Sequence, residues 1–202
     1  MIPAVFLDRD GVLNELVFNA VTGEYESPHA PEDLVMINGV VAALRRLAVA
    51  GFALFLVSNQ PSYAKGKTTL ENIREIHRRL DGFLRDNGID FLEYFYCYHH
   101  PRAVVPAYSG PCRCRKPAPY FLLEAARAYR VDLASSWMVG DQDTDMECGR
   151  SAGCMTALVM NAHSATKRGS SRPDVTVTTL SEAVEQIISR RKGDEVNDQA
   201  EH

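Results

Sequence analysis

The chain has 202 residues, of which 46% are hydrophobic and 24% are charged, and this length and apolar content suit one ordinary domain with a buried core. A formal charge of −4 gives no general attraction to nucleic acid or anionic lipid, and no apolar run approaches the roughly 18 residues of a membrane span. We therefore expect a cytoplasmic, monomeric protein whose partner is a small molecule, with no nucleic-acid or membrane partner.

Short apolar runs alternate with segments of helical periodicity along the chain. Strands are predicted at residues 4–7, 53–57, 95–98, 137–140, 156–160 and 175–177, and helices at 40–51, 68–88 and 119–129. Thr68 and Glu71 are spaced as a capping box for the second helix, and Pro119 is expected in the first turn of the third. The alternation predicts an α/β fold, a doubly wound (Rossmann-like) parallel sheet with helices on both faces.

Two long segments, 14–32 and 98–119, show no clear period and are interpreted as functional loops. Because these loops and the predicted elements use up the chain, no large cap domain can be inserted. Residues 1–190 are expected to form a single domain. Residues 191–202 have few apolar side chains and are predicted to be a solvated, disordered tail.

Carboxylates follow two of the predicted strands. Asp8 and Asp10 come directly after the first strand and before Gly11, and their repulsion is costly unless a cation lies between them. Taken alone, this string also fits a solvated turn. The 137–140 strand, however, ends in the same way, at Asp141, with Asp145 close behind. Since the carboxyl ends of parallel strands share one edge of a sheet, we expect these acids to converge.

Neutral donors and a cation are expected at the same edge. Ser58, Asn59 and Gln60 follow the second strand, and Lys116 precedes the helix at 119–129. Carboxylates, hydroxyl and amide donors and one ammonium group are the set that phosphoryl transfer to a carboxylate requires. The sequence therefore favours an enzyme acting on a phosphate ester.

Four motifs carry a family resemblance, and their order and spacing resemble those of the haloacid dehalogenase-like (HAD) phosphatases. They are Asp8-x-Asp10, Ser58-Asn59, Lys116 and Asp141-x-x-x-Asp145. The resemblance covers roughly residues 4–160 and implies the same parallel sheet. It also implies that Asp8 attacks phosphorus, that Asp10 protonates the leaving oxygen and later activates water, and that Asp8, the Asp10 carbonyl and Asp141 hold Mg²⁺. Lys116, Ser58 and Asn59 would contact the phosphate, and Asp145 would support the metal site. The acid at position 10 favours ester hydrolysis over dehalogenation.

A second metal site is predicted within the 98–119 loop and the strand before it. Cys97, His99, Cys112 and Cys114 offer a full tetrahedral set for a structural Zn²⁺, leaving no position for water. His100 is a competing ligand. Unrelated buried cysteines are the alternative, and a zinc-binding module without enzymatic activity is the rival function. Zinc-binding modules that recognise nucleic acid are usually basic, whereas this chain is acidic.

The zinc pattern resembles the D-glycero-D-manno-heptose 1,7-bisphosphate phosphatases and the related histidinol-phosphate phosphatases. This resemblance implies hydrolysis of the 7-phosphate of the heptose bisphosphate, with histidinol phosphate or another sugar phosphate as the alternative. Arg115, Lys65, Asn59 and Gln60 are the candidate substrate-binding residues. Gln142 stands where the heptose family often has lysine or arginine, so the exact sugar and its pathway stay open.

Overall fold

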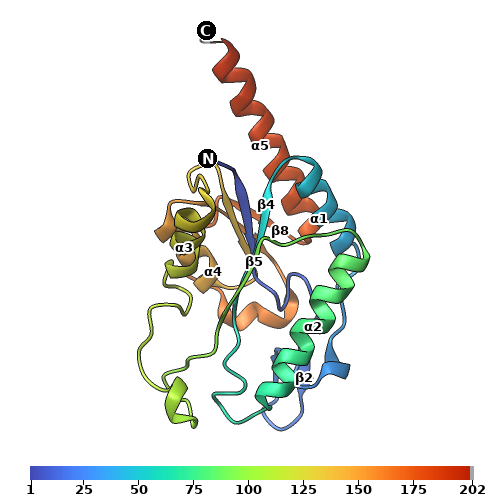
Figure 1. The fold of residues 1–202 in the computed structure, drawn as a ribbon, viewed down its shortest axis with the longest axis vertical. Helices are drawn as coiled ribbons and strands as arrows, with labels where there is room; N and C mark the ends of the chain where they lie inside the picture. Colours follow the sequence, from blue (N-terminus) through green and yellow to red (C-terminus); the bar gives the residue numbers. More distant parts are fainter. Residues whose placement is uncertain (201–202) are drawn as a thin grey trace.

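The structure is a computed structural model that describes the backbone of residues 1–200 and the side chains of residues 1–191. Within that part of the chain, six parallel strands form one sheet (Figure 1). The strand order is β5 (Glu93–Cys97), β4 (Ala53–Asn59), β1 (Ala4–Leu7), β6 (Trp137–Gly140), β7 (Met155–Val159) and β8 (Val175–Val177). The predicted doubly wound parallel sheet is confirmed.

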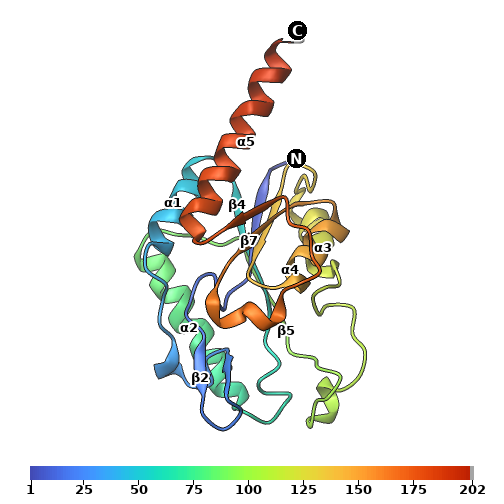
Figure 2. The same ribbon diagram turned by 180° about the vertical axis from the view of Figure 1, so that it is seen from behind.

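Helices cover both faces of the sheet, as Figure 2 shows from behind. One face packs against α1 (Val40–Val49), α2 (Leu70–Asp86) and α5 (Leu180–Ala200), and the other packs against α3 (Tyr120–Tyr129) and α4 (Asp143–Ala152). Side chains of β1 alternate between the two cores, since Val5 and Leu7 join the first and Phe6 joins the second. All three are fully buried, and burial of such a side chain stabilises the fold by about 1.5–3 kcal/mol.

The two predicted loops contain short elements. Segment 14–32 forms an antiparallel hairpin of β2 (Val17–Asn19) and β3 (Glu24–Glu26), followed by the 3-10 turn η1 (Pro31–Asp33). Segment 98–119 contains η2 (Pro106–Tyr108), and η3 (Ala162–Lys167) follows β7. The hairpin escaped prediction because its strands are three residues long, too short for a period-two pattern to stand out.

Several predicted boundaries were wrong. Thr69, not Thr68, caps α2: its hydroxyl accepts the Asn72 amide at 3.0 Å, whereas Thr68 donates to the His29 carbonyl. Pro119 occupies the N-cap position of α3 rather than its first turn. Strand β5 begins at Glu93, two residues before the predicted start, because its backbone pairs with β4 from Phe55 onward.

The C-terminal helix extends into the segment that was predicted to be a tail. The backbone of α5 is helical to Ala200, so the predicted tail at 191–202 begins inside this helix. Arginine, lysine, glutamate and glutamine are good helix formers, so a low apolar content does not by itself end a helix. Residues 201 and 202 lie outside the described residues. No helix in the described part of the chain is both long and apolar enough to cross a membrane.

Candidate active site

The turn after β1 brings two strand ends together. Asp8 and Asp10 lie on this turn, and Gly11 adopts a φ of 81°, a conformation that favours glycine. A Cβ at position 11 would lie 2.3 Å from the Asp141 Oδ2 atom, so the residue has to be glycine for steric reasons as well. The sharp turn therefore allows the carboxylate after β6 to approach the carboxylates after β1.

Three carboxylates and one ammonium group form a buried charge cluster at this sheet edge. The Lys116 Nζ atom lies 3.0 Å from Asp8 Oδ1 and 2.6 Å from Asp145 Oδ1, and it donates to the Val57 carbonyl at 2.7 Å. Lys116 is 3% exposed. Burial alone would lower the pKa of Lys116, but the charges of Asp145 and Asp8 outweigh this effect and raise it. The lysine is therefore held in its charged form.

The third carboxylate of the cluster, that of Asp141, lacks a partner. Its two oxygens are buried and accept no hydrogen bond among the described residues. Burial and the nearby charges of Asp145 and Asp8 raise the pKa of Asp141 to about 7. Asp8, Asp141 and Asp145 can each place one oxygen within 4.8 Å of the others. With all four groups ionised the cluster has a net charge of −2, which a divalent cation bound by oxygen ligands would balance.

Asp10 has a different environment from the other acids. Its carboxylate accepts hydrogen bonds from the side chains of Arg9, Asn14 and Gln60. Burial would raise the pKa of Asp10, but the Arg9 charge and these hydrogen bonds outweigh burial and lower it. Sequence reasoning missed Arg9 and Asn14. In the sequence Arg9 lies between the two acids and Asn14 comes four residues after Asp10, and neither position reveals where the side chain points.

The polar residues after β4 form hydrogen bonds within the protein. The Asn59 side chain pairs with the backbone of Lys116, donating to its carbonyl and accepting its amide, both at 3.1 Å. Gln60 is 1% exposed, and it donates to the Ser58 hydroxyl at 3.0 Å as well as to Asp10. Asn59 therefore positions the lysine, and Gln60 lies behind the site rather than in contact with bulk solvent.

All members of the charge cluster except Asp141 line a cavity of about 290 Å³. Asp8, Asp10, Asn59, Lys116 and Asp145 contribute to its lining, while the hairpin contributes residues 24–27 to its wall. Cations also line the cavity, namely Lys65, Lys67, Arg115 and Lys167. Lys65 and Arg115 were predicted as substrate-binding residues. Lys67 pairs with Glu26 at 2.5 Å, and Lys167 gave no signal in the sequence because only the fold brings η3 to the cavity.

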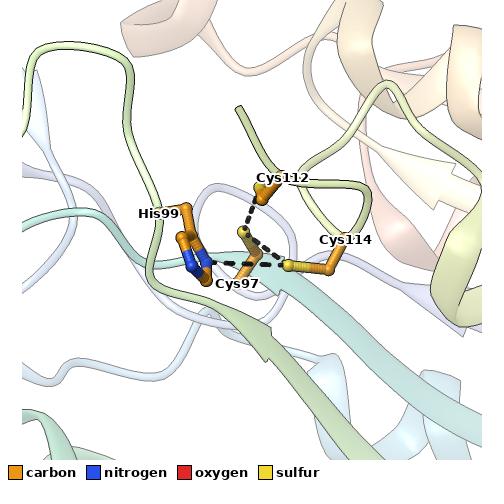
Figure 3. Close-up of side chains that lie close together, drawn as sticks. All are labelled: Cys97, His99, Cys112 and Cys114. Atoms are coloured by element: carbon orange, nitrogen blue, oxygen red, sulfur yellow. Dashed lines mark hydrogen bonds between the residues drawn. The ribbon is translucent and has the colours of Figure 1, made fainter. Parts of the chain in front are cut away.

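The cysteine and histidine side chains predicted to bind zinc lie together (Figure 3). The Cys97 sulfur is 3.7 Å from that of Cys112 and 3.2 Å from that of Cys114, and the Cys114 sulfur is 3.8 Å from His99 Nδ1. Zinc–sulfur bonds of about 2.3 Å place the sulfurs of a tetrahedral site about 3.8 Å apart. The four side chains thus have nearly the spacing and the soft donor atoms of a closed zinc site.

The competing ligand, His100, points into another interaction. Its Nδ1 accepts the Arg102 backbone amide at 3.1 Å, and it is not part of the four-residue cluster. On the other side of the cluster, Cys114 is followed directly by Arg115 and Lys116. Arg115 Nη1 donates to the His99 carbonyl at 3.2 Å. The thiol cluster, which consists of Cys97, His99, Cys112 and Cys114, is therefore linked to the charge cluster through the backbone at Arg115 and through this hydrogen bond.

A parallel sheet with Asp8 and Asp10 after its first strand, and with Lys116 between buried carboxylates, defines a HAD-type phosphatase. In agreement, a profile of the HAD-hydrolase-like family matches residues 113–183. The D-glycero-β-D-manno-heptose-1,7-bisphosphate 7-phosphatase of Yersinia pestis is 35% identical over 192 residues, covering 95% of this chain and 98% of that protein. The enzyme of the same name from Escherichia coli K12 is 33% identical, covering 95% and 96%.

A solved structure gives the same result. The D,D-heptose 1,7-bisphosphate phosphatase of B. bronchiseptica, crystallised with magnesium and phosphate, is 28% identical to this chain with a TM-score of 0.76, covering 94% of this chain and 99% of that one. The chain therefore belongs to the family of the D-glycero-β-D-manno-heptose-1,7-bisphosphate 7-phosphatases, and it is a phosphoric monoester hydrolase.

Proposed function

We propose that this enzyme removes the 7-phosphate of D-glycero-D-manno-heptose 1,7-bisphosphate through an aspartyl-phosphate on Asp8. The relatives named above carry this substrate in their names, and the sequence match extends over nearly the whole chain. The observation that carries the proposal is the position of Asp8. It lines a cavity that also presents lysine and arginine side chains, and it is paired with Lys116 beside an unpartnered buried carboxylate.

Hydrogen bonds distinguish the two oxygens of Asp8. Oδ1 accepts the Arg9 backbone amide at 2.7 Å and lies 3.0 Å from Lys116 Nζ, whereas Oδ2 has no hydrogen bond among the described residues. Oδ2 is therefore the oxygen available to form the bond to phosphorus, while the bond from phosphorus to the sugar oxygen breaks. Lys116 offsets the repulsion between the attacking carboxylate and the phosphate oxygens.

Asp10 is the proton-transfer residue of the proposal. It lines the cavity and is two residues from the nucleophile in the chain. For the first step Asp10 takes up a proton from water against its lowered pKa, and that proton then goes to the sugar oxygen as the bond from phosphorus to that oxygen breaks. In the second step Asp10 accepts a proton from the water that hydrolyses the aspartyl-phosphate, which restores Asp8 and releases phosphate.

A divalent cation fits the residues present. Asp8, Asp141 and the Asp10 carbonyl would hold Mg²⁺, with Asp145 retaining Lys116, because the two oxygens of Asp141 otherwise lack any partner. Bound there, Mg²⁺ would neutralise charge on the nucleophile and the phosphate. The chemistry of the second donor set, three sulfurs and one imidazole nitrogen, suits a structural Zn²⁺ held by Cys97, His99, Cys112 and Cys114.

Selectivity for a bisphosphate is expected from the cavity wall. Arg115 and Lys65 line it beside the reacting centre, and burial together with the neighbouring charges of Lys67 and Arg115 lowers the pKa of Lys65. A second anionic group on the substrate would reduce the electrostatic repulsion between these neighbouring cations. Histidinol phosphate, which has only one phosphate, would leave them unpaired and is the weaker substrate candidate.

A comparative assay tests this function. The heptose bisphosphate, its monophosphates and histidinol phosphate are compared by kcat/KM in the presence of Mg²⁺, and we expect the bisphosphate to be hydrolysed with the highest value. Asp8→Asn should abolish turnover because an amide cannot attack phosphorus, while the exposed Asp86→Asn serves as the matched control. Substantial turnover by Asp8→Asn, or a preference for histidinol phosphate, contradicts the proposal.

A further inference from the structure

Arg9 is a charged side chain buried where it cannot touch the substrate. It is the largest of the fully buried residues in the described part of the chain, with 1% of its surface exposed. It does not line the cavity. Removal of a guanidinium from water is costly unless its charge and its donors find partners. The partners of Arg9 should therefore indicate why the chain retains it.

The Arg9 guanidinium grips the Asp10 carboxylate as a fork. Nε donates to Oδ1 at 3.1 Å, while Nη2 lies 3.0 Å from Oδ1 and 3.2 Å from Oδ2. The same Nη2 donates to Gln60 Oε1 at 2.9 Å, and Gln60 Nε2 donates back to Asp10 Oδ2 at 2.5 Å. Three side chains thus form a closed ring in which each contacts the other two.

The ring is anchored to the sheet. Gln60 follows β4; its backbone amide donates to the Cys97 carbonyl at 2.7 Å, and its side chain also donates to the Ser58 hydroxyl. Asn14 adds a further donor to Asp10 Oδ1 at 3.0 Å. Both oxygens of Asp10 are therefore held from the side away from the cavity by side chains that are themselves fixed.

We propose that Arg9 and Gln60 are positioning residues that fix the direction of the Asp10 carboxylate for proton transfer to the leaving oxygen. This inference rests on the role proposed above for Asp10. Both residues act through Asp10 without contacting the substrate, and a displacement of about 1 Å at a reacting group can cost on the order of 10²-fold in rate. Their loss should therefore impair reactions that need a proton more than reactions that do not.

The leaving group separates these two kinds of reaction. A sugar alkoxide must be protonated as it departs, whereas p-nitrophenolate departs without a proton. In both cases the first step forms the bond from Asp8 to phosphorus and breaks the bond to the leaving oxygen. Single-turnover measurements with enzyme in excess report this step alone, so slow hydrolysis of the aspartyl-phosphate does not interfere. The readout is the ratio of the rate constant for the preferred sugar phosphate to that for p-nitrophenyl phosphate.

Two variants are compared with wild type. Arg9→Lys keeps a charge but loses the planar fork, and Gln60→Met removes one donor at similar volume. We expect each to lower the ratio at least about 10-fold, in the same direction as Asp10→Asn, whereas the exposed Arg45→Lys leaves it unchanged. Circular dichroism checks folding, and if Arg9→Lys does not fold, Gln60→Met decides the question.

An equal fall for both substrates would show a merely structural role and overturn the inference, as would an unchanged ratio. A wild-type protein that hydrolyses neither substrate would instead count against the proposed function. An active wild type with an unchanged ratio in both variants would count against the positioning role alone.

Discussion

The molecule has two clusters that could hold a metal ion, and they are built in opposite ways. The carboxylates of Asp8, Asp141 and Asp145 come from distant parts of the chain and meet only because β1 and β6 are neighbours in the sheet. The thiol and imidazole ligands all lie within residues 97–114. The first cluster is buried, opens to the cavity and contains its own ammonium group, while the second consists of soft donors alone.

This difference assigns different tasks to the two sites. Hard oxygen ligands that open to a cavity suit an ion that takes part in chemistry, whereas a complete tetrahedral set of soft ligands leaves no position for a substrate. The clusters meet at Cys114, Arg115 and Lys116, where the loop ends. A metal in the thiol cluster would therefore restrain Lys116 in the charge cluster. Loss of that metal should then lower the activity of the catalytic site.

The largest expected effect within this comparison is the loss of the Lys116 charge. Lys116→Met removes the ammonium group between Asp8 and Asp145 and should lower kcat by roughly 10²- to 10³-fold, comparable to the loss of one oxyanion-hole donor, with a smaller change in KM. Steady-state kinetics with the preferred substrate measure both constants. Near-normal kcat would show that the lysine serves only the fold.

A smaller effect is expected from the thiol cluster. Purified protein should contain one zinc ion, and Cys112→Ser should lower zinc content and reduce kcat about 10-fold or less, because Arg115 and Lys116 lose their restraint without leaving the site. Cys154→Ser is the matched control, since Cys154 is buried in the second core and outside the cluster. Elemental analysis measures the zinc. A zinc-free wild type, or equal zinc loss in both variants, would contradict the ligand assignment.

Sequence reasoning succeeded where a short pattern directly specifies a position in space. The buried runs at β1 and β6 each end in a carboxylate, and parallel strands end at one edge, so the meeting of Asp8 and Asp141 could be predicted. The cysteine ligands are close in the chain, so their grouping needed little knowledge of the fold. The predicted sheet and the family resemblance, which rest on such short patterns, were also confirmed.

The same reasoning could not predict contacts that depend on side-chain direction or distant packing. Asn59 lines the cavity, and its amide also pairs with the Lys116 backbone, a contact that the sequence does not reveal. Arg9 gave no sign that it turns behind Asp10, because a residue between two acids can point either way. Lys167 reaches the cavity only because η3 is tied to the chain after β6, with the Ser164 hydroxyl donating to the Asp141 carbonyl at 3.1 Å.

The finest test of the comparison concerns Arg115, the residue between the two clusters. Its Nη1 is held by the His99 carbonyl, and the residue lines the cavity, so its remaining donors are preoriented toward a second anionic group of the substrate. A contact made equally in the ground and transition states changes KM rather than kcat. Arg115→Ala should therefore raise KM for the bisphosphate about 10-fold while kcat falls less, as expected for one lost charged hydrogen bond.

The control for this prediction lies on the other side of Cys114. Arg113 is exposed and stacks on the Tyr120 ring, with 4.7 Å between its guanidinium carbon and the ring centroid, and it does not line the cavity. Arg113→Ala should leave KM unchanged for every substrate, and Arg115→Ala should leave KM unchanged for substrates with a single phosphate. If Arg115→Ala raises KM equally for one and two phosphates, the arginine contacts the reacting phosphate instead, and selectivity for a bisphosphate must come from Lys65 and the remaining cations of the cavity wall.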